Sequence, residues 1–177
     1  GAAWGSGDII VLATNPGLRQ VPGAGGEPTA VTRLDSARGD VSHLWPDFLP
    51  DGKTVLFTIR GRDGVDRLGA ATLAGGAVTR FTQAGSNPHY VTTGHVTLAN
   101  SDGTIISVPF DARRVAIAGA AVPVAEAVPI GTGGVAKMGV SRSGSFAYAG
   151  GSAGARSIVL VDRHGVGQAI TTELREY

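Results

Sequence analysis

The residues Trp45-Pro46-Asp47-Phe48-Leu49-Pro50-Asp51-Gly52-Lys53-Thr54-Val55-Leu56-Phe57-Thr58 have the pattern of a β-hairpin. An Asp-Gly pair readily adopts the positive φ angles of a tight turn. The Val, Leu, Phe and Thr residues after it suit a pleated, half-buried surface. The pattern therefore predicts two antiparallel strands that are joined at Pro50-Asp51-Gly52.

Weaker copies of this hairpin recur along the chain. The glycines of the first turn in each copy are Gly7, Gly52, Gly94 and Gly144, with spacings of 45, 42 and 50 residues. A period of about 40–50 residues with four short strands is typical of β-propeller blades. The sequence therefore predicts one all-β propeller domain over residues 1–177, with about four blades of four-stranded antiparallel sheet over residues 1–42, 43–86, 87–134 and 135–177.

The fourth strands of the first two repeats have nearly the same sequence. Ala30-Val31-Thr32-Arg33-Leu34 follows Gly25-Gly26 after three residues, and Ala77-Val78-Thr79-Arg80-Phe81 follows Gly75-Gly76 directly. We therefore expect a strand over residues 29–34 in the first repeat and over residues 78–82 in the second.

Composition limits the class of protein. The chain has 177 residues, of which 42% are apolar and 16% charged, and its 28 Gly and 9 Pro indicate many turns. The net charge is +1 and neither sign forms a long run, so a nucleic-acid-binding surface is not expected. There is no cysteine, hence no disulfide framework or thiolate zinc site.

Targeting signals are not evident in the sequence. No apolar segment approaches the ~20 residues of a membrane-spanning helix, so direct membrane insertion is not expected. The start Gly1-Ala2-Ala3-Trp4 does not have the features of a signal peptide. The sequence alone therefore predicts either a cytoplasmic protein or a piece of a longer one.

Several motifs carry a family resemblance. The Pro50-Asp51-Gly52 turn and the Gly25-Gly26 and Gly75-Gly76 turns before Thr-rich outer strands resemble the Pro-Asp-Gly repeats of TolB-like β-propellers. The segments SHLWPDFLPDG, VPFDARR and VPVAE are similar to the propeller region that follows the kinase domain in many bacterial serine/threonine protein kinases; they span residues 42–52, 108–114 and 122–126. The resemblance covers essentially all of the chain. It is weaker in the first and last repeats, where Ser-Gly replaces Asp-Gly.

The resemblance implies a function without catalysis. In such kinases the propeller commonly lies beyond a membrane anchor and is taken to be a sensor or interaction surface, which implies an extracytoplasmic location. TolB-like propellers usually have six or more blades, so four repeats imply part of a larger propeller. Arg175-Glu176-Tyr177 resembles the start of a further blade. Open blade edges would favour pairing with a second copy of the chain.

One motif resembles a hydrolase nucleophile. Gly150-Gly151-Ser152-Ala153-Gly154 matches G-x-S-x-G, and Asp162 and His164 follow in hydrolase order. A nucleophile elbow requires a turn from a strand into a helix, whereas residues 156–160 continue as a strand. A hairpin loop is therefore the favoured interpretation, and no catalytic residue is predicted.

A second motif resembles the end of a phosphate-binding loop. Gly52-Lys53-Thr54 has the required residues, but the fifth residue before Gly52 is Asp47 instead of glycine. A strand also follows where a helix N-terminus should supply the N–H groups. We therefore interpret Lys53 as a solvated turn residue and predict no cofactor.

Metal ligands are not grouped in the sequence. The four histidines are dispersed without a pair at ligand spacing: His43, His89, His95 and His164. His89 and His95 flank one predicted hairpin and could approach each other, but hydrogen bonding to turn backbone is favoured. Asp47 and Asp51 lack the remaining ligands of a calcium loop, so both are interpreted as turn residues. No metal site is predicted.

Charged and aromatic residues also have structural interpretations. Mixed signs close together in the second repeat favour a solvated loop over a recognition loop: Arg60, Arg62, Asp63, Asp66 and Arg67. The main aromatic residues are interpreted as blade packing rather than a binding platform: Trp45, Phe48, Phe57, Phe146 and Tyr148.

The sequence thus predicts a non-catalytic β-propeller interaction or sensor module, not an enzyme, with a protein or small-molecule ligand that is not identified. Two alternatives stay open. One is the propeller portion of a hydrolase, which would need polar residues from several blades near the axis, whereas these strands are rich in Val, Ile, Ala and Leu. The other is a structural unit completed by self-association.

Overall fold

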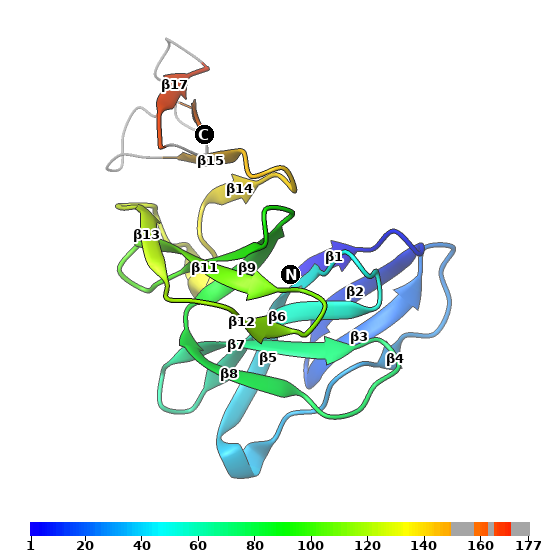
Figure 1. The fold of residues 1–177 in the computed structure, drawn as a ribbon. Coiled ribbons are helices and arrows are strands. Elements are labelled where there is room, and N and C mark those ends of the chain that lie inside the picture. The colour runs from blue at the N-terminus through cyan, green and yellow to red at the C-terminus, as the bar shows by residue number, and fades with distance from the viewer. Residues whose placement is uncertain (150–157, 163–164, 171–177) are drawn as a thin grey trace. The chain divides into compact units, whose positions relative to one another are not determined.

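The computed structural model describes residues 1–149, 158–162 and 165–170, and these form four antiparallel sheets, here called blades one to four. Blade one has the order β1 (Ala2–Trp4), β2 (Ile9–Thr14), β3 (Gly17–Pro22) and β4 (Thr29–Ala30). Blade two has the order β5 (Asp40–Phe48), β6 (Thr54–Gly61), β7 (Asp66–Thr72) and β8 (Thr79–Ala84). Each strand pairs with the next one along the chain, so both blades are simple meanders (Figure 1).

Blades three and four complete the set. Blade three contains β9 (Ser86–Val91), β10 (His95–Ala99), β11 (Ile105–Asp111), β12 (Ala116–Ile117) and β13 (Val122–Ala125), of which β12 and β13 both pair with β11. Blade four has the order β14 (Met138–Val140), β15 (Phe146–Ala149), β16 (Ile158–Val161) and β17 (Gly167–Ala169). The prediction of four-stranded antiparallel sheets is confirmed, with the short β12 as an addition.

Helical structure is limited to two short 3₁₀ turns in the described ranges, η1 (Ser36–Arg38) and η2 (Thr132–Gly134). Neither approaches the length and apolar character that crossing a bilayer requires. The chain divides into two compact units, Gly1–Tyr90 and Val91–Tyr177.

The hairpin of blade two has the predicted turn chemistry. Gly52 has a φ of 64°. Asp51 accepts hydrogen bonds from the backbone N–H groups of Lys53 and Thr54, both at 2.9 Å, and from the Thr54 hydroxyl at 2.6 Å. The other repeats use equivalent turns, with positive φ at Gly94 and Gly144, whereas in blade one Asp8 adopts it, next to Gly7.

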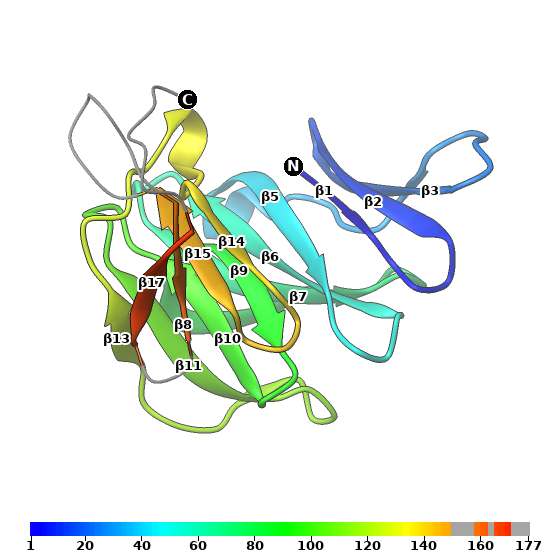
Figure 2. The ribbon, with the colours of Figure 1, turned by 90° about the horizontal axis from the view of Figure 1, so that it is seen from above.

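The core of the first unit lies between blades one and two, which face each other in both views (Figures 1 and 2). Its buried side chains come from both sheets: Val11, Leu18, Val31, Phe48, Val55, Phe57, Ile59 and Ala71. Blade one approaches closely at Gly5, where an added Cβ would lie 2.8 Å from Cζ of Phe48. The same kind of core forms in the second unit, where Phe146 of blade four packs with Ile105 and Ala99 of blade three.

The predicted aromatic packing is confirmed for Phe48, Phe57 and Phe146, which are buried. Trp45 differs, because it is only half-buried and its backbone has a φ of 53°. It lies at an irregularity of the β5–β6 pairing between Leu44 and Asp47. A β-bulge of this kind re-aims a side chain, which the alternation of the sequence does not reveal.

The predicted fourth strand of blade one was wrong over residues 31–34. β4 ends at Ala30, and the backbone N–H groups of Val31 and Thr32 both donate to the Leu18 carbonyl, at 2.9 and 3.2 Å. The chain therefore turns inward after β4, and Val31 and Thr32 are buried instead of forming an outer edge.

Candidate binding site

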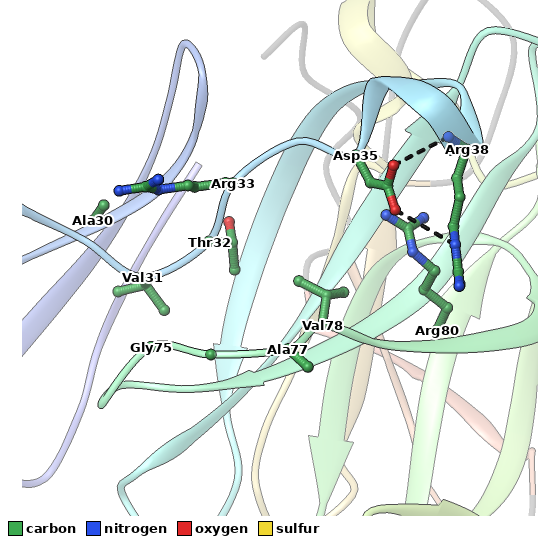
Figure 3. Close-up of a pocket in the computed structure, with 11 residues that line it drawn as sticks. Ala30, Val31, Thr32, Arg33, Asp35, Arg38, Gly75, Ala77, Val78 and Arg80 are labelled. Carbon is green, nitrogen blue, oxygen red and sulfur yellow. Dashed lines mark hydrogen bonds and ion pairs between the residues drawn. The ribbon is translucent and has the colours of Figure 1, made fainter.

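A cavity of about 620 Å³ opens between the end of blade one and the outer part of blade two. Its polar wall consists of Thr32, Arg33, Asp35, Arg38 and Arg80, while Val31, Val78 and the Gly75-Gly76 loop line the rest. Figure 3 shows Asp35, Arg38 and Arg80 gathered on one side, with Arg33 extending away from them. Arginine predominates among the charged groups of the wall.

The link between the two blades positions this wall. Asp35 caps η1 by accepting a hydrogen bond from the Arg38 backbone N–H at 3.2 Å, and its carboxylate lies 3.4 Å from Nε of Arg38. Gly39 ends the 3₁₀ turn with a φ of 83°, a left-handed conformation that favours glycine. The turn therefore returns the chain into β5 and leaves Arg38 at the surface.

A buried ion pair lies behind the wall and joins β5 to β8. Both guanidinium Nη atoms of Arg80 donate to the Asp40 carboxylate, one of them over 2.7 Å to Oδ1. The Asp40 side chain is 1% exposed and that of Arg80 21%. Asp40 also accepts a hydrogen bond from the Asp35 backbone N–H at 2.9 Å. Since β5 and β8 are the two edge strands of blade two, the pair spans the face of that sheet.

His43 extends this ion pair into a hydrogen-bonded chain. Its Nε2 lies 3.2 Å from Oδ2 of Asp40, and its Nδ1 lies 2.8 Å from the hydroxyl of Thr32. The Thr32 hydroxyl in turn accepts a hydrogen bond from the Leu18 backbone N–H at 2.9 Å. We call Thr32, Asp40, His43 and Arg80 the buried network.

The directions of the hydrogen bonds follow from the protonation states. Burial acts to raise the pKa of Asp40, but the hydrogen bond and charge of Arg80, with the Asp35 N–H, hold it below its usual value. Burial lowers the pKa of His43, although the Asp40 carboxylate opposes this shift. A neutral His43 next to an ionised Asp40 donates a hydrogen bond to Asp40 from Nε2 and accepts one from the Thr32 hydroxyl at Nδ1.

The network has the composition of a catalytic triad but not the access that catalysis requires. His43 is 0% exposed and Thr32 is 2% exposed, so both side chains are buried. The oxygen of Thr32 and both ring nitrogens of His43 already have protein partners. Because every member is satisfied internally, the network fixes the chain between the blades and positions Arg80 at the cavity.

Acid should weaken the fold through the buried His43 and the half-buried His89. Burial lowers the pKa of both His43 and His89. As the pH falls, these histidines take up protons in the unfolded chain before they do so in the folded one. Their effect on the free energy of unfolding is therefore absent above the unfolded pKa of about 6.5, and the free energy of unfolding falls as the pH drops below it. We expect the free energy of unfolding, from denaturant melts, to decrease between pH 7.5 and pH 5. The slope should be smaller in His43→Gln and in His89→Gln, and equal slopes in all three proteins would contradict this account.

Several residues singled out in the sequence have structural partners. Asp51 is a turn residue, as predicted, and Lys53 is exposed. Asp47 was predicted wrongly as a turn residue, since it lies in β5 and accepts a hydrogen bond from the Tyr90 backbone N–H at 2.8 Å. Ser152, His164 and residues 175–177 lie outside the described ranges.

The histidines and the charged residues of the second repeat have local partners too. His89 hydrogen-bonds Asn87 at 2.9 Å, and His95 lies 3.3 Å from the Thr93 hydroxyl. In the part of the chain that the structure describes, no three His, Asp or Glu side chains are grouped to hold a metal ion. The predicted charged loop was wrong for three of its residues, because Arg60 lies in β6 and Asp66 and Arg67 lie in β7. These residues form two ion pairs, Arg60–Asp66 and Arg67–Asp63, each at 2.7 Å.

Sequence reasoning missed the roles of Thr32, Asp40 and Arg80. Asp40 and Arg80 lie 40 positions apart, and no local pattern connects them. The one available signal was the Asp-x-x-His spacing of Asp40 and His43 at the start of a strand, where neither a turn nor a solvated loop explains both residues.

No known family profile and no curated protein matches the chain. Solved structures do match, among them TolB from Acinetobacter baumannii, with a TM-score of 0.67, 19% identity, and coverage of 96% of this chain and 42% of that one. A TolB-type protein from Agrobacterium tumefaciens has a TM-score of 0.70, 17% identity, and coverage of 93% and 61%. Regucalcin from Agrobacterium tumefaciens, a calcium-binding protein, has a TM-score of 0.67, 20% identity, and coverage of 95% and 58%.

These likenesses show the fold. The four sheets are blades of a β-propeller of the kind found in TolB, which confirms the predicted fold class. The chain spans about half the length of the structures it matches. The resemblance to kinase-associated propellers stays a prediction.

Proposed function

We propose that this chain is a non-catalytic β-propeller module that binds a ligand or protein partner without transforming it. The observation that carries the proposal is the burial of the network. The histidine and carboxylate that could perform acid–base chemistry are enclosed, and their polar atoms are bound to protein groups. The surface next to them instead presents arginine side chains around an open cavity, which suits recognition of an anionic group.

The wider role that we propose is that of a sensor or interaction part of a bacterial signalling protein. The resemblance to the propellers of serine/threonine kinases supports this role, and with it an extracytoplasmic location. Calcium binding is stated for regucalcin, whereas the described residues of this chain contain no group of three carboxylate or histidine side chains.

A screen for hydrolysis tests the proposal. We expect the purified chain to show no esterase, peptidase, glycosidase or lactonase activity above that of Ser152→Ala. Lactones belong in the screen because a 6-phosphogluconolactonase-like structure from Bacteroides fragilis shares this fold. Turnover that is lost in Ser152→Ala, or in His43→Gln with the fold retained by circular dichroism, would overturn the proposal and favour the propeller portion of a hydrolase.

A further inference from the structure

A second cavity, of about 690 Å³, adjoins the first at the end of blade two where η1 and the β6–β7 turn meet. It shares Arg38 and Arg80 with the first cavity and adds Arg62 and Arg67. Four arginines thus line it against two carboxylates, those of Asp40 and Asp63. We call it the arginine cavity.

The arginines of this cavity differ in how far they are neutralised. Arg80 is paired with Asp40, and Arg67 with Asp63 over 2.7 Å. Arg38 is 70% exposed and lies 3.4 Å from Asp35. The side chain of Arg62 is exposed and has no hydrogen bond or ion pair within the described ranges. The charge left for a ligand is therefore concentrated at Arg62 and Arg38.

The backbone holds these two arginines on neighbouring segments. The Arg62 N–H donates to the Gly39 carbonyl at 2.8 Å, so the β6–β7 turn is fixed against the end of η1. The turn itself is tightly built, because a Cβ on Gly61 would lie 2.3 Å from Oδ1 of Asp63 and 3.2 Å from Nη1 of Arg67. The backbone segments that carry Arg38 and Arg62 are therefore held next to each other.

The rest of the cavity is apolar. Ile59, which is 4% exposed, and the half-buried Phe81 line it beside the arginines. Sites for small molecules commonly have volumes of about 300–1,000 Å³ and combine apolar walls with a few polar groups that fix orientation. This cavity has that size and combination, with a cationic group as the orienting element.

We propose that the arginine cavity binds a small organic anion whose carboxylate or phosphate group contacts Arg62 and Arg38 and whose apolar, planar body packs on Phe81. Arginine binds both carboxylate and phosphate through paired N–H groups, and an aromatic face suits a flat apolar body. The inference rests on the proposed binding function and names the ligand class for it.

Titration with simple probes tests the inference. We would measure binding of benzoate, phenyl phosphate, acetate and inorganic phosphate to the intact chain by calorimetry, at fixed ionic strength. Benzoate and phenyl phosphate should each bind about tenfold tighter than acetate and inorganic phosphate, because only they have a body to bury. Comparing the first two probes tells whether carboxylate or phosphate is preferred.

Variants locate the site. Arg62→Gln should weaken binding of both aromatic probes about tenfold or more, since a charge-assisted hydrogen bond is lost. Arg113→Gln, the same change at an exposed arginine of blade three, should have no effect. Phe81→Ser should remove the preference for benzoate over acetate. If the serine variant unfolds, the same two affinities are compared in Phe81→Leu. In backbone amide spectra, benzoate should shift Gly39, Arg62 and Phe81.

The inference is overturned if benzoate binds no tighter than acetate, or if Arg62→Gln and Arg113→Gln bind it equally. Such a result would leave the proposed function standing, because that proposal fails only through Ser152- or His43-dependent turnover. The opposite combination is also distinguishable. Benzoate binding that depends on Arg62 would support the arginine cavity, even if turnover of a substrate overturned the non-catalytic function.

Discussion

Asp40→Asn is expected to lower the free energy of unfolding of the first unit by about 3 kcal/mol, because the substitution leaves the guanidinium of Arg80 without its carboxylate in a largely buried place. It also weakens the acceptor for His43 and for the Asp35 backbone N–H. Since whole domains are stable by only about 5–15 kcal/mol, the loss should be plain in a denaturant melt.

The matched control is Asp63→Asn. Asp63 makes an ion pair of the same kind with Arg67, but in that pair both side chains are well exposed. Exposed pairs of this type contribute little to stability, so the control should melt close to the parent chain. If the two substitutions cost the same, burial of the Asp40–Arg80 pair is not what makes it important.

Phe57→Ala is expected to cost about 4 kcal/mol, within the range for removing a large buried aromatic side chain. Phe57 is 0% exposed and lies on β6, which pairs with both β5 and β7. Its ring centroid lies 4.8 Å from that of His43, and a Cβ on Gly69 would lie 3.0 Å from its Cε2. The surrounding structure is therefore closely packed and cannot readily fill the space that is left.

Phe57→Leu is the companion variant. Leucine retains much of the volume and apolar surface, so its cost should stay at about 1–2 kcal/mol. A melt in which alanine and leucine are equally destabilising would show that the loss comes from the aromatic contact with His43 and not from the cavity. Both melts are best followed by tryptophan fluorescence, since Trp45 lies on the neighbouring strand β5.

The architecture was predictable because it is repeated and local. The Pro50-Asp51-Gly52 turn is determined by its own residues. Asp51 accepts hydrogen bonds from the backbone N–H groups two and three residues later, and Gly52 has a positive φ. The alternation and apolar runs between the turns then placed most strands within a few residues of their observed bounds. The bulge at Trp45 was not predictable, because it depends on pairing with β6.

The candidate site was not predictable because equal sequences have different roles in it. Thr32-Arg33 and Thr79-Arg80 occupy the same place in two nearly identical pentapeptides. In the structure Thr32 is buried against His43 while Arg33 is exposed, whereas Thr79 is exposed and Arg80 binds Asp40. The difference arises from Asp40 and His43, which lie between the two copies in the sequence. His43 binds the threonine of the first copy, and Asp40 binds the arginine of the second.

The ion pair across blade two also affects how the sheet opens. Arg80 lies on the outer edge strand β8 and Asp40 on the opposite edge strand β5, so β8 cannot separate from β7 by itself without exposing a buried charge pair. The outer edge of blade one is different, because β4 has only two residues and both are exposed. Amide hydrogens of β8 should therefore exchange with solvent only in large, cooperative openings of blade two, while those of β4 exchange through local fraying.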